Sequence, residues 1–437
     1  MAHPISLDSR RPFWPSFAPR NLGAAQVAPD SSTTLDETRR RWIIKVMTTE
    51  LFVAAATQKV AIYLGGENQI QFVVLLHIIT LYLLAAKGCL RIHALRLALY
   101  LVMMALALVA HALSQHSAFS IPSMMLFSII YGLYLFVIPL DRETYLRLLK
   151  NLQYATTGAA LLVLSNWFTQ AIGLGMPNIE TVIPSKFLFF YYVYIQPIHW
   201  GSRWIKPNGI FFLETSFVSQ FIAFGLIIEV CFFRRIFVLG LLGAGLMSTF
   251  GGTGLLLVAL SAVVVLFYLN RTLILALAIA LPLAAAGAYG IGLLDNMAKR
   301  SDEFSQNGSS ANQRFLAPIE TINEAVEGNS FKYFFGIGAG NMPRAMNIAW
   351  NPTSKFFREY GMIAFMAWFV FIAYCYLGNG VPFIVGWIMF VQYHLLNGSL
   401  LVPIISVYSI IFAAGYVITD DRCSPPTPAQ RPGSGRR

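Results

Sequence analysis

The Lys and Arg residues that could bind an anionic ligand gather in two stretches of the chain, about 173–208 and about 294–355. They are Lys186, Arg203 and Lys206 in the first stretch, and Lys299, Arg300, Arg314, Lys332, Arg344 and Lys355 in the second, followed directly by Arg358. A guanidinium group binds phosphate oxygens in pairs, and an ammonium group binds them as a point charge. Several such groups at one membrane surface suit a diphosphate held on a lipid carrier.

Two carboxylates accompany these cations at expected helix starts. Glu214 follows the turn signal Pro207-Asn-Gly209, and Glu359 falls within the first two turns of a helix that Pro352 favours. A glycosyl transfer that releases a diphosphate needs cations on the leaving group and a base for the attacking hydroxyl. Both glutamates are candidate bases. Two plainer readings stay open: Glu214 can stabilise a helix N-terminus, and Glu359 can form a salt bridge with Lys355.

The second basic stretch also contains two local patterns. Residues 315–326 have apolar side chains at helical spacing, which predicts a short helix lying on the membrane surface. The glycines of Gly336-x-Gly338-x-Gly340 lack the strand and crossover helix of a dinucleotide site. We expect them to form a close turn that brings backbone amides near a ligand.

The composition places the whole chain in the membrane class. It is 57% hydrophobic and 12% charged, whereas an ordinary soluble domain has about one quarter charged residues, so a soluble enzyme is excluded. The four cysteines do not pair within an outer loop, and the seven histidines have no metal-ligand spacing. We therefore expect no disulfide, metal or other cofactor.

Apolar runs long enough to cross a bilayer predict an all-α polytopic fold of about twelve transmembrane helices. The runs are near 42–64, 69–86, 94–113, 119–140, 152–172, 209–231, 235–251, 253–268, 273–293, 356–377, 380–396 and 400–418. The polar, Pro- and Arg-rich ends, 1–41 and 419–437, are expected to be disordered tails. Between them, 42–418 forms one transmembrane domain with two long loops that contain short helices.

The short connections predict the orientation of this domain. Positive residues near helix ends tend to stay in the cytoplasm. One set of connections is rich in Lys and Arg, beginning with Arg39 to Arg41, whereas the short turns of the other set have none. Both termini are therefore expected to be cytoplasmic, in a multi-pass membrane protein. The two long basic loops, which depart from this charge rule, then face the periplasm, and their charge is either merely tolerated or forms a site.

Three patches of the chain resemble the O-antigen polymerase and ligase superfamily of bacterial integral-membrane glycosyltransferases. Residues 206–216, Lys-Pro-Asn-Gly-Ile-Phe-Phe-Leu-Glu-Thr-Ser, are similar to the family's Arg-x-x-Gly-x-Phe-x-Glu-Pro-Ser segment. Arg314 followed by 335–340, Phe-Gly-Ile-Gly-Ala-Gly, is similar to its Arg and Gly-x-Gly-x-Gly segment. Asn351, Glu359 and Gly361 have the spacing of its His-Asn-x-x-Leu-(x)4-Glu-x-Gly motif.

The resemblance implies a location in the bacterial inner membrane and a reaction without metal or cofactor. A growing glycan would pass from undecaprenyl diphosphate to a sugar hydroxyl of a lipid-linked repeat unit. The expected diphosphate-binding residues are Arg203, Lys206, Arg314, Arg344, Lys355 and Arg358, and the expected catalytic residues are Glu214, Glu359 and Arg314. The expected partners are a polyprenyl-diphosphate-linked oligosaccharide, membrane lipids, and a chain-length regulator and flippase of the same pathway, with no nucleic acid.

Departures from the family pattern help to order the alternatives. Trp350 stands where ligases have a histidine thought to act as base, which favours the Wzy-like polysaccharide polymerase branch over a ligase that transfers finished polymer. Lys206 stands where an arginine is usual, and Arg203 could replace it. A transporter or flippase is the alternative of another class; the nearly charge-free helix interiors and the lack of an internal repeat disfavour it. Aromatic residues of the first loop, such as Tyr191, Tyr192, Tyr194, Trp200 and Trp204, could stack on sugars or form an interfacial belt.

Overall fold

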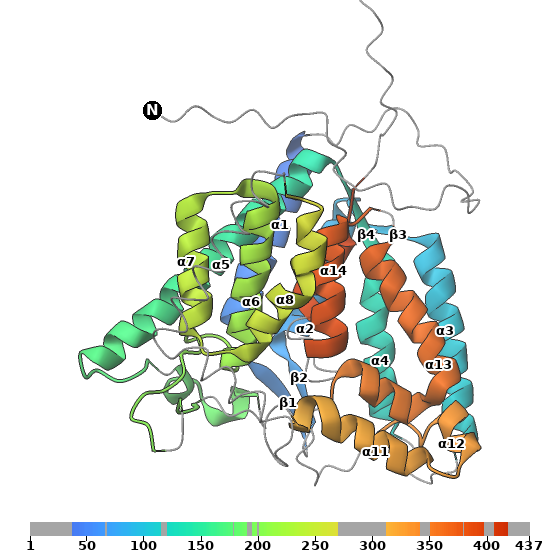
Figure 1. Ribbon diagram of the computed structural model, residues 1–437. Coiled ribbons are helices and arrows are strands. Elements are labelled where there is room, and N and C mark those ends of the chain that lie inside the picture. Colours follow the sequence, from blue (N-terminus) through green and yellow to red (C-terminus); the bar gives the residue numbers. More distant parts are fainter. Residues whose placement is uncertain are drawn as a thin grey trace, which may run out of the picture.

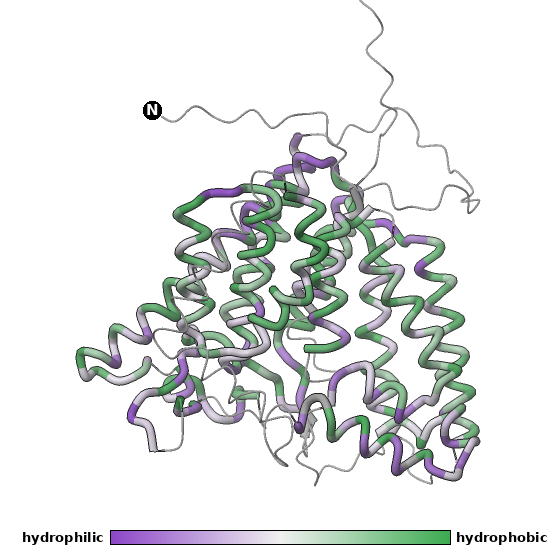
Figure 2. Tube along the Cα trace, viewed as in Figure 1, coloured by the Kyte–Doolittle hydropathy of each residue, from purple (hydrophilic) through white to green (hydrophobic). Residues whose placement is uncertain are grey.

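The computed structural model describes residues 37–65, 68–114, 120–177, 179–189, 195–198, 201–269, 312–340, 350–378, 380–396 and 406–417. These residues form a bundle of helices whose flanks are apolar and whose two ends carry most of the polar residues (Figures 1 and 2). Three of the described helical segments are long and apolar enough to cross a membrane: Ala94–Leu113, Thr215–Phe233 and Pro352–Leu377. The predicted membrane class and mainly helical fold are therefore supported, whereas the count of twelve spans stays a prediction.

Most predicted spans correspond to a described helix. The main helices are α1 (Glu37–Ala56), α2 (Phe72–Ala86), α3 (Ala94–Leu113), α4 (Ile121–Gly132), α5 (Arg142–Ala171), α6 (Thr215–Ile228), α7 (Ile236–Ser248), α8 (Gly252–Leu266), α13 (Pro352–Leu377), α14 (Phe383–Val391) and α15 (Ser406–Ala414). Single π-helical turns extend α6 and α14, namely η4 (Glu229–Phe233) and η7 (Gln392–Leu396). The predicted span 273–293 lies outside the described residues.

The expectation of an all-α fold is wrong in one respect, because short strands close both ends of the bundle. β1 (Ala61–Gly65) and β2 (Asn68–Gln71) form an antiparallel hairpin where the first predicted span was expected to continue to residue 64. β3 (Arg91–Ile92), β4 (Phe136–Leu140) and β5 (Gly415–Val417) form a small sheet at the other end. Strands satisfy backbone groups where these chain segments leave their helices.

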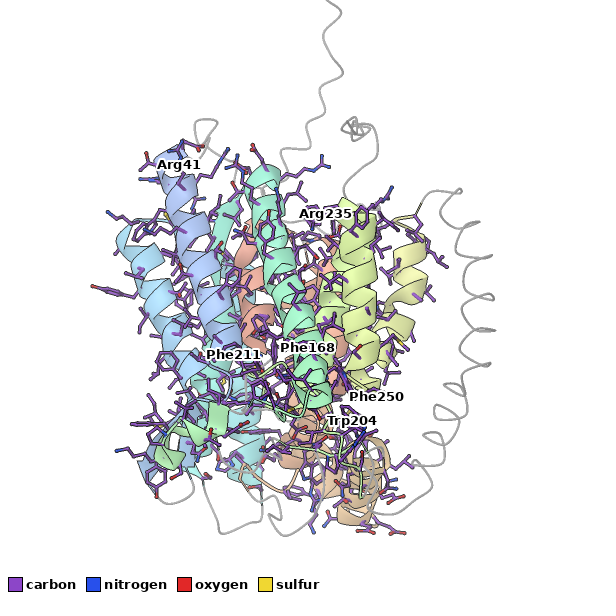
Figure 3. The ribbon with its side chains drawn as sticks, turned by 90° about the vertical axis from the view of Figure 1, so that its left-hand side faces the viewer. Arg41, Phe168, Trp204, Phe211, Arg235 and Phe250 are labelled. Carbon is purple, nitrogen blue, oxygen red and sulfur yellow. The ribbon has the colours of Figure 1, made fainter. Side chains whose placement is uncertain are left out.

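The described parts of both long basic loops lie at the end of the bundle that carries β1 and β2, which we call the loop end (Figure 1). The described elements of the loops are η2 (Ile179–Thr181), η3 (Ser185–Phe187), the π-helical turn η6 (Asn312–Leu316), α11 (Ala317–Val326) and α12 (Ser330–Phe335). α11 confirms the short helix predicted within 315–326. The end that carries β3, β4 and β5 is called the opposite end. Arg41 and Arg235 lie toward it and Trp204 toward the loop end, as Figure 3 shows.

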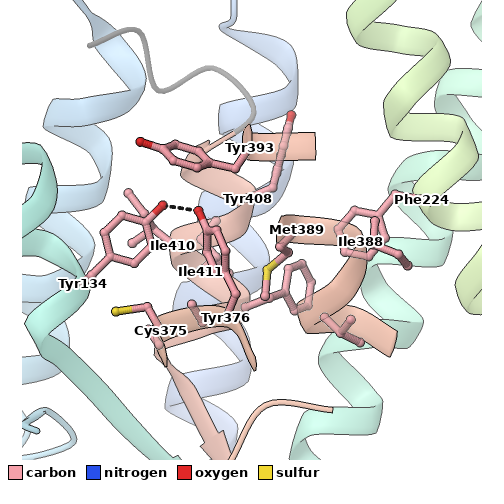
Figure 4. Packing of buried hydrophobic residues seen from close by; sticks show 14 of the residues in the cluster. Tyr134, Phe224, Cys375, Tyr376, Ile388, Met389, Tyr393, Tyr408, Ile410 and Ile411 are labelled. Carbon is pink, nitrogen blue, oxygen red and sulfur yellow. Dashed lines mark hydrogen bonds between the residues drawn. The ribbon is translucent and has the colours of Figure 1, made fainter. Parts of the chain in front are cut away.

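The core between the two ends is rich in tyrosine, and it ties the C-terminal helices to the middle of the chain (Figure 4). Tyr134, in the turn η1 (Leu133–Leu135), and Tyr376 of α13 are fully buried, with their hydroxyl oxygens 2.5 Å apart. Tyr131 and Tyr393 form a second buried hydroxyl pair. A buried hydroxyl without a partner is costly, so these pairs allow tyrosines to fill an apolar bundle.

Candidate active site

Glu214 is the residue directly before α6, at the loop end. Its backbone is extended, and its carbonyl oxygen accepts hydrogen bonds from the amides of Phe217 at 3.1 Å and Val218 at 3.4 Å. Its half-buried carboxylate does not cap the helix; instead Oε2 accepts a hydrogen bond from Ser216 Oγ at 3.2 Å. The predicted position at the helix start is confirmed. The start of α6 therefore fixes the backbone of Glu214, and its carboxylate is not used to cap the helix.

A tight turn positions Glu214 relative to the first basic loop. Gly209 and Ile210 both have positive φ, 65° and 66°. Ile210 is a β-branched residue in a left-handed conformation, which is strained and persists only where its surroundings hold it. Two buried asparagines do so: Asn208 Oδ1 accepts from the Ile210 amide at 3.0 Å, and Asn166 Oδ1, from α5, accepts from the Gly209 amide at 3.2 Å.

Lys59 holds the same turn from the other side. Its side chain is 2% exposed, and Nζ donates to the carbonyl oxygen of Ile210 at 2.6 Å and to Glu180 Oε1 at 2.5 Å. Burial lowers the pKa of Lys59, against the opposing effect of Glu180. Lys59 falls within the predicted span 42–64 and was not among the predicted site residues. A lysine in such a run was the available signal, because a buried cation requires partners.

Arg203 and Lys206 lie on a short hairpin that leads into this turn. Pro197 and Ile205 form an antiparallel bridge, and the Lys206 amide donates to the Gln196 carbonyl at 2.8 Å. The side-chain amide of Gln170, at the end of α5, accepts from the Ile205 amide at 2.8 Å and donates to its carbonyl at 3.1 Å. This double contact fixes the hairpin to the bundle, so the two predicted cations have a defined backbone position.

The exposed Arg203 stacks on one ring of an aromatic cluster. Its guanidinium carbon lies 5.1 Å from the centre of the Trp204 ring. The ring centres of Trp204 and Trp167, in α5, are 5.7 Å apart. Those of Trp167 and Phe250, in the turn between α7 and α8, are also 5.7 Å apart (Figure 3). Cation–π contact holds a guanidinium without neutralising it. Of the loop aromatics predicted as sugar platforms, Trp204 belongs to this cluster, whereas Tyr191, Tyr192, Tyr194 and Trp200 lie outside the described residues.

In the second loop, the glycine-rich turn packs against a break in α13. Gly361 has φ 73° and ψ 178°, which interrupts the helix. The carbonyl oxygens of Arg358 and Glu359 accept hydrogen bonds from the amides of Ile337 at 3.0 Å and Gly338 at 2.9 Å. A Cβ at Gly361 would lie 2.4 Å from the carbonyl carbon of Phe334. Such close backbone contact explains why glycine is required here.

The remaining amides of the turn also bind the protein. The Ala339 amide donates to Nδ1 of His111, in α3, at 3.3 Å, and the Gly340 amide donates to Glu359 Oε1 at 3.2 Å. Four consecutive amides, 337 to 340, therefore have partners within the bundle. The expectation that they would be presented to a ligand is wrong, because the helix break supplies carbonyl acceptors that α13 no longer uses. The turn is a docking element between the second loop and two helices.

The charged residues at the start of α13 contact one another and the second loop. The start itself is confirmed: Pro352 is the first helical residue, and Asn351 Oδ1 accepts from the Ser354 amide at 2.8 Å. Lys355 Nζ lies 3.9 Å from Oε1 of Glu359, whose side chain is 3% exposed. The salt bridge that sequence reasoning left open is therefore present.

The Arg358 side chain contacts two parts of the second loop. Its Nη1 donates to the Thr321 carbonyl of α11 at 3.5 Å, and its guanidinium carbon lies 5.2 Å from the centre of the Trp350 ring. Trp350 is buried, with 9% of its surface exposed. Trp350, which stands where the resemblance places the histidine of ligases, thus contacts Arg358 near the start of α13.

Glutamines and a histidine that sequence reasoning overlooked connect the two motif helices. Gln220 of α6 donates to the Leu396 carbonyl at 3.4 Å, and Gln392 of η7 donates back to the Gln220 carbonyl at 3.4 Å. Thr353, at the start of α13, contacts Nδ1 and donates to the carbonyl of His394, both at 3.0 Å. The π-helical turn η7 therefore joins the helix of Glu214 to the helix of Glu359.

The predicted site residues fall into two groups at the loop end. Arg203, Lys206 and Glu214 belong to one continuous segment leading into α6, and Lys355, Arg358 and Glu359 belong to the first turns of α13. Arg314 belongs to η6, but its side chain lies outside the described part, and Arg344 lies outside the described residues altogether. A diphosphate site shared by the two loops stays a prediction.

Of the comparisons with known proteins, one identifies a family. No curated protein and no solved structure matches the chain. The model of one family, described as WcaD colanic acid polymerase, matches residues 43–351, more than two thirds of the chain. The match contains the segment from Arg203 to Glu214 and ends at Asn351, the residue that caps α13. This protein belongs to the WcaD colanic acid polymerase family.

Proposed function

We propose that this membrane protein polymerises a bacterial surface polysaccharide, an exopolysaccharide or an O-antigen. It transfers a growing glycan from undecaprenyl diphosphate to a sugar hydroxyl of a lipid-linked repeat unit. The reaction takes place at the loop end of the bundle, on the periplasmic side of the inner membrane. The observation that carries the proposal is the cationic hairpin anchored beside the N-terminus of α6, where Glu214 stands. Family membership supplies the class of reaction.

The chemistry assigned to the site is a single displacement. The bond between the anomeric carbon and the diphosphate oxygen breaks, and its electron pair leaves with the diphosphate. The acceptor hydroxyl forms the new glycosidic bond and gives its proton to the Glu214 carboxylate. Arg203 and Lys206 bind the leaving diphosphate, together with Arg314 and Arg344, so its negative charge is neutralised without a metal ion.

Glu359, Lys355 and Arg358 have a positioning role in this proposal. Glu359 is buried and binds the Gly340 amide, and Arg358 binds α11 through Thr321. These contacts hold the described part of the second loop against α13, at the end of the bundle where the donor is proposed to bind. A residue that holds its loop in this way affects the rate through geometry, which is sensitive to displacements on the order of 1 Å.

The polymerase assignment is favoured over the ligase by Trp350. Trp350 is buried beneath the Arg358 guanidinium, where an indole cannot act as a base. The acceptor is then a lipid-linked repeat unit rather than a finished lipid or protein anchor. A chain-length regulator and a flippase of the same pathway are the proposed partners, and both termini lie in the cytoplasm.

The decisive experiment uses a deletion strain complemented with the wild type, Glu214→Gln or Arg314→Ala. Surface and lipid-linked glycans are separated on gels. Loss of long chains, with single repeat units still attached to their final acceptor, is the result expected of a polymerase. Long chains stranded on the lipid carrier would instead indicate a ligase, and wild-type chains in the empty deletion strain would reject both assignments.

The matched control is Glu320→Gln, which removes an exposed carboxylate from α11 at the same end. We expect Glu320→Gln to retain long chains and Glu214→Gln to lower polymer yield on the order of 100-fold, the smaller end of the contribution of a general base. Equal yields from the two variants would remove Glu214 from the site. Protein amounts in membranes are compared by immunoblot, so that loss of protein is not read as loss of chemistry.

A further inference from the structure

An apolar groove runs along the side of the bundle between α1 and α5. Its volume is about 480 Å³, and its lining includes Phe52 and Ala55 of α1 and Ala155, Gly158 and Leu162 of α5. Among the described residues that line it, none is Lys, Arg, Asp or Glu. Tyr154 and Ser165 are the polar side chains of this lining, which leaves the groove suited to hydrocarbon.

Small residues create the groove below a fixed contact between the two helices. Asn151 of α5 donates to Thr48 Oγ1 of α1 at 2.7 Å. In each helix, the residues that line the groove come after this contact in the sequence. Both helices run toward the loop end, so the groove lies between the contact and that end (Figure 3). A Cβ at Gly158 would meet no atom within 4 Å, so the space beside it is open. The hydrogen bond thus holds α1 and α5 together above an opening that small side chains leave unfilled.

At the loop end, the groove is bounded by the proposed diphosphate segment itself. Phe211 and Phe212 line it, and they lie between Lys206 and Glu214 in the chain. Figure 3 places Phe211 between α1 and α5. The preceding residue, Ile210, is held by Lys59 at 2.6 Å. One short segment therefore carries cations on its polar side and forms the end of an apolar groove with its phenylalanines.

The contact between the groove and the proposed diphosphate segment indicates which ligand suits the groove. A substrate with a diphosphate joined to a long hydrocarbon needs cations at a membrane surface and an apolar channel leading from them into the bilayer. The groove volume falls in the range of small-molecule sites, roughly 300–1,000 Å³, which suits a few prenyl units better than a helix of a second protein. The exposed aromatic rings of its lining, Phe52 and Tyr154, offer flat faces to a branched, unsaturated chain.

We infer that the groove between α1 and α5 binds the first prenyl units of the polyprenyl diphosphate substrate. The inference rests on the proposed function, since it takes the diphosphate to lie at the segment from Arg203 to Glu214. The groove selects the carrier lipid and sets the depth at which its diphosphate reaches the cations. Membrane phospholipid has two acyl chains and a different headgroup, so it lacks the diphosphate that the segment from Arg203 to Glu214 is proposed to bind.

The test uses the purified full-length protein in lipid nanodiscs and a polyprenyl diphosphate with a diazirine on its early prenyl units. Irradiation is expected to label peptides containing 52–56 and 154–165. Gly158→Trp fills the groove and should lower this labelling about tenfold or more, a change of one order in binding. Gly243→Trp in α7 is the matched control, because Gly243 is also half-buried and helical, and a Cβ added there would meet no atom within 4 Å; it should label as the wild type does.

Competition identifies the occupant. Excess unlabelled polyprenyl diphosphate should abolish the labelling, and the same excess of phosphatidylglycerol should not. Equal competition by phosphatidylglycerol would show that the groove is a general lipid contact. Cross-linked protein dimers that form in the wild type and are lost in Gly158→Trp would show that it is a protein interface. Either result overturns the inference. If Gly158→Trp elutes as an aggregate, Ala55→Leu on the facing helix fills the same space.

The glycan gel separates this inference from the proposed function. Long chains made by the wild type, with labelling that misses the groove, reject the groove alone. Long chains made by the deletion strain reject the proposed function, whatever the labelling pattern. Loss of both labelling and long chains in Gly158→Trp, with both retained in Gly243→Trp, supports the two proposals together.

Discussion

The two ends of the bundle use their cations in different ways. At the opposite end, Arg96 is 2% exposed and donates to three carbonyl oxygens, those of Tyr134 at 3.1 Å, Cys375 at 3.2 Å and Ala413 at 2.9 Å. Near the same end, Arg235 binds Glu229 in a bidentate pair. At the loop end, Arg203 is exposed and stacks on Trp204.

The difference teaches how this protein separates stability from ligand binding. A cation placed on helix-terminal carbonyls or on a buried carboxylate is committed to the fold. A cation held by an aromatic ring keeps its charge available to an anion. Where the loop end does bury a cation, as at Lys59, the residue fixes the strained turn that precedes Glu214. The variants below test this division of roles, from the largest expected effect to the smallest.

Removing Arg96 should have the largest effect on stability. Arg96→Met would leave three buried carbonyls without their donor, which we expect to lower the free energy of unfolding by about 3 kcal/mol or more. Thermal unfolding of the detergent-purified protein, followed by tryptophan fluorescence, measures the change. Arg91→Met is the control, since Arg91 is an exposed arginine of the adjacent strand β3. Equal midpoints for the two variants would contradict a structural role for Arg96.

The contact between the glycine-rich turn and α13 should be next in size. Gly361→Ala adds a Cβ that would lie 2.4 Å from the Phe334 backbone at a φ of 73°. We expect a loss of about 2–3 kcal/mol and a matching fall in polymer yield. Gly328→Ala is the control, because Gly328 has a φ of 67° but no atom within 4 Å of its Cβ position; it should cost about 1 kcal/mol. Similar losses of stability in Gly361→Ala and Gly328→Ala would show that the cost comes from the positive φ and not from the contact with Phe334.

Substitution of Arg203 should affect the substrate rather than the fold. In Arg203→Ala, the loss of one charge-assisted contact of about 1.5 kcal/mol should raise the KM for the lipid-linked donor about tenfold. Turnover by membranes supplied with increasing donor gives the KM. Arg41→Ala removes an exposed arginine at the opposite end and should leave KM unchanged. An unchanged KM in Arg203→Ala would mean that the first loop does not bind the diphosphate.

The smallest expected effect concerns the pH dependence contributed by Lys59. Burial lowers the pKa of Lys59 below its ordinary value of 10.5, so between the lowered pKa and 10.5 the unfolded chain binds more protons than the folded one. Stability therefore rises with pH in this window and falls as pH drops from 10.5 to the lowered pKa. The unfolding free energy of the wild type minus that of Lys59→Met should increase toward pH 10.5, by less than about 1.4 kcal/mol per pH unit. A difference that is flat or decreases with pH would reject this account.

Local patterns in the sequence were sufficient for several features. Apolar runs predicted α3, α6 and α13, because about 20 residues must be apolar to cross a bilayer. Pro352 predicted the start of α13, and the Pro-Asn-Gly signal predicted the turn before Glu214. These features depend on bonds between residues a few positions apart, which neighbouring residue types are able to specify.

Long-range partners could not be predicted in this way. The glycine-rich amides were expected to face a ligand, and they bind the broken end of α13 and His111 instead. Lys59 lies within the predicted span 42–64, but α1 ends at Ala56 and gives way to a hairpin, so that Lys59 falls between them. In both cases the partner lies far away in the chain, so nothing in the local residue pattern indicates it.

By itself, the sequence determined the membrane class, the two basic loops and the residue types available for binding a diphosphate, because hydropathy and charge are properties of residues and their spacing. Only the tertiary structure decided which cations are consumed by the fold and which glycines form backbone contacts. It also decided where an apolar groove meets the polar segment. These features arise when distant segments approach one another, and burial then sets the cost of every unpaired charge and amide.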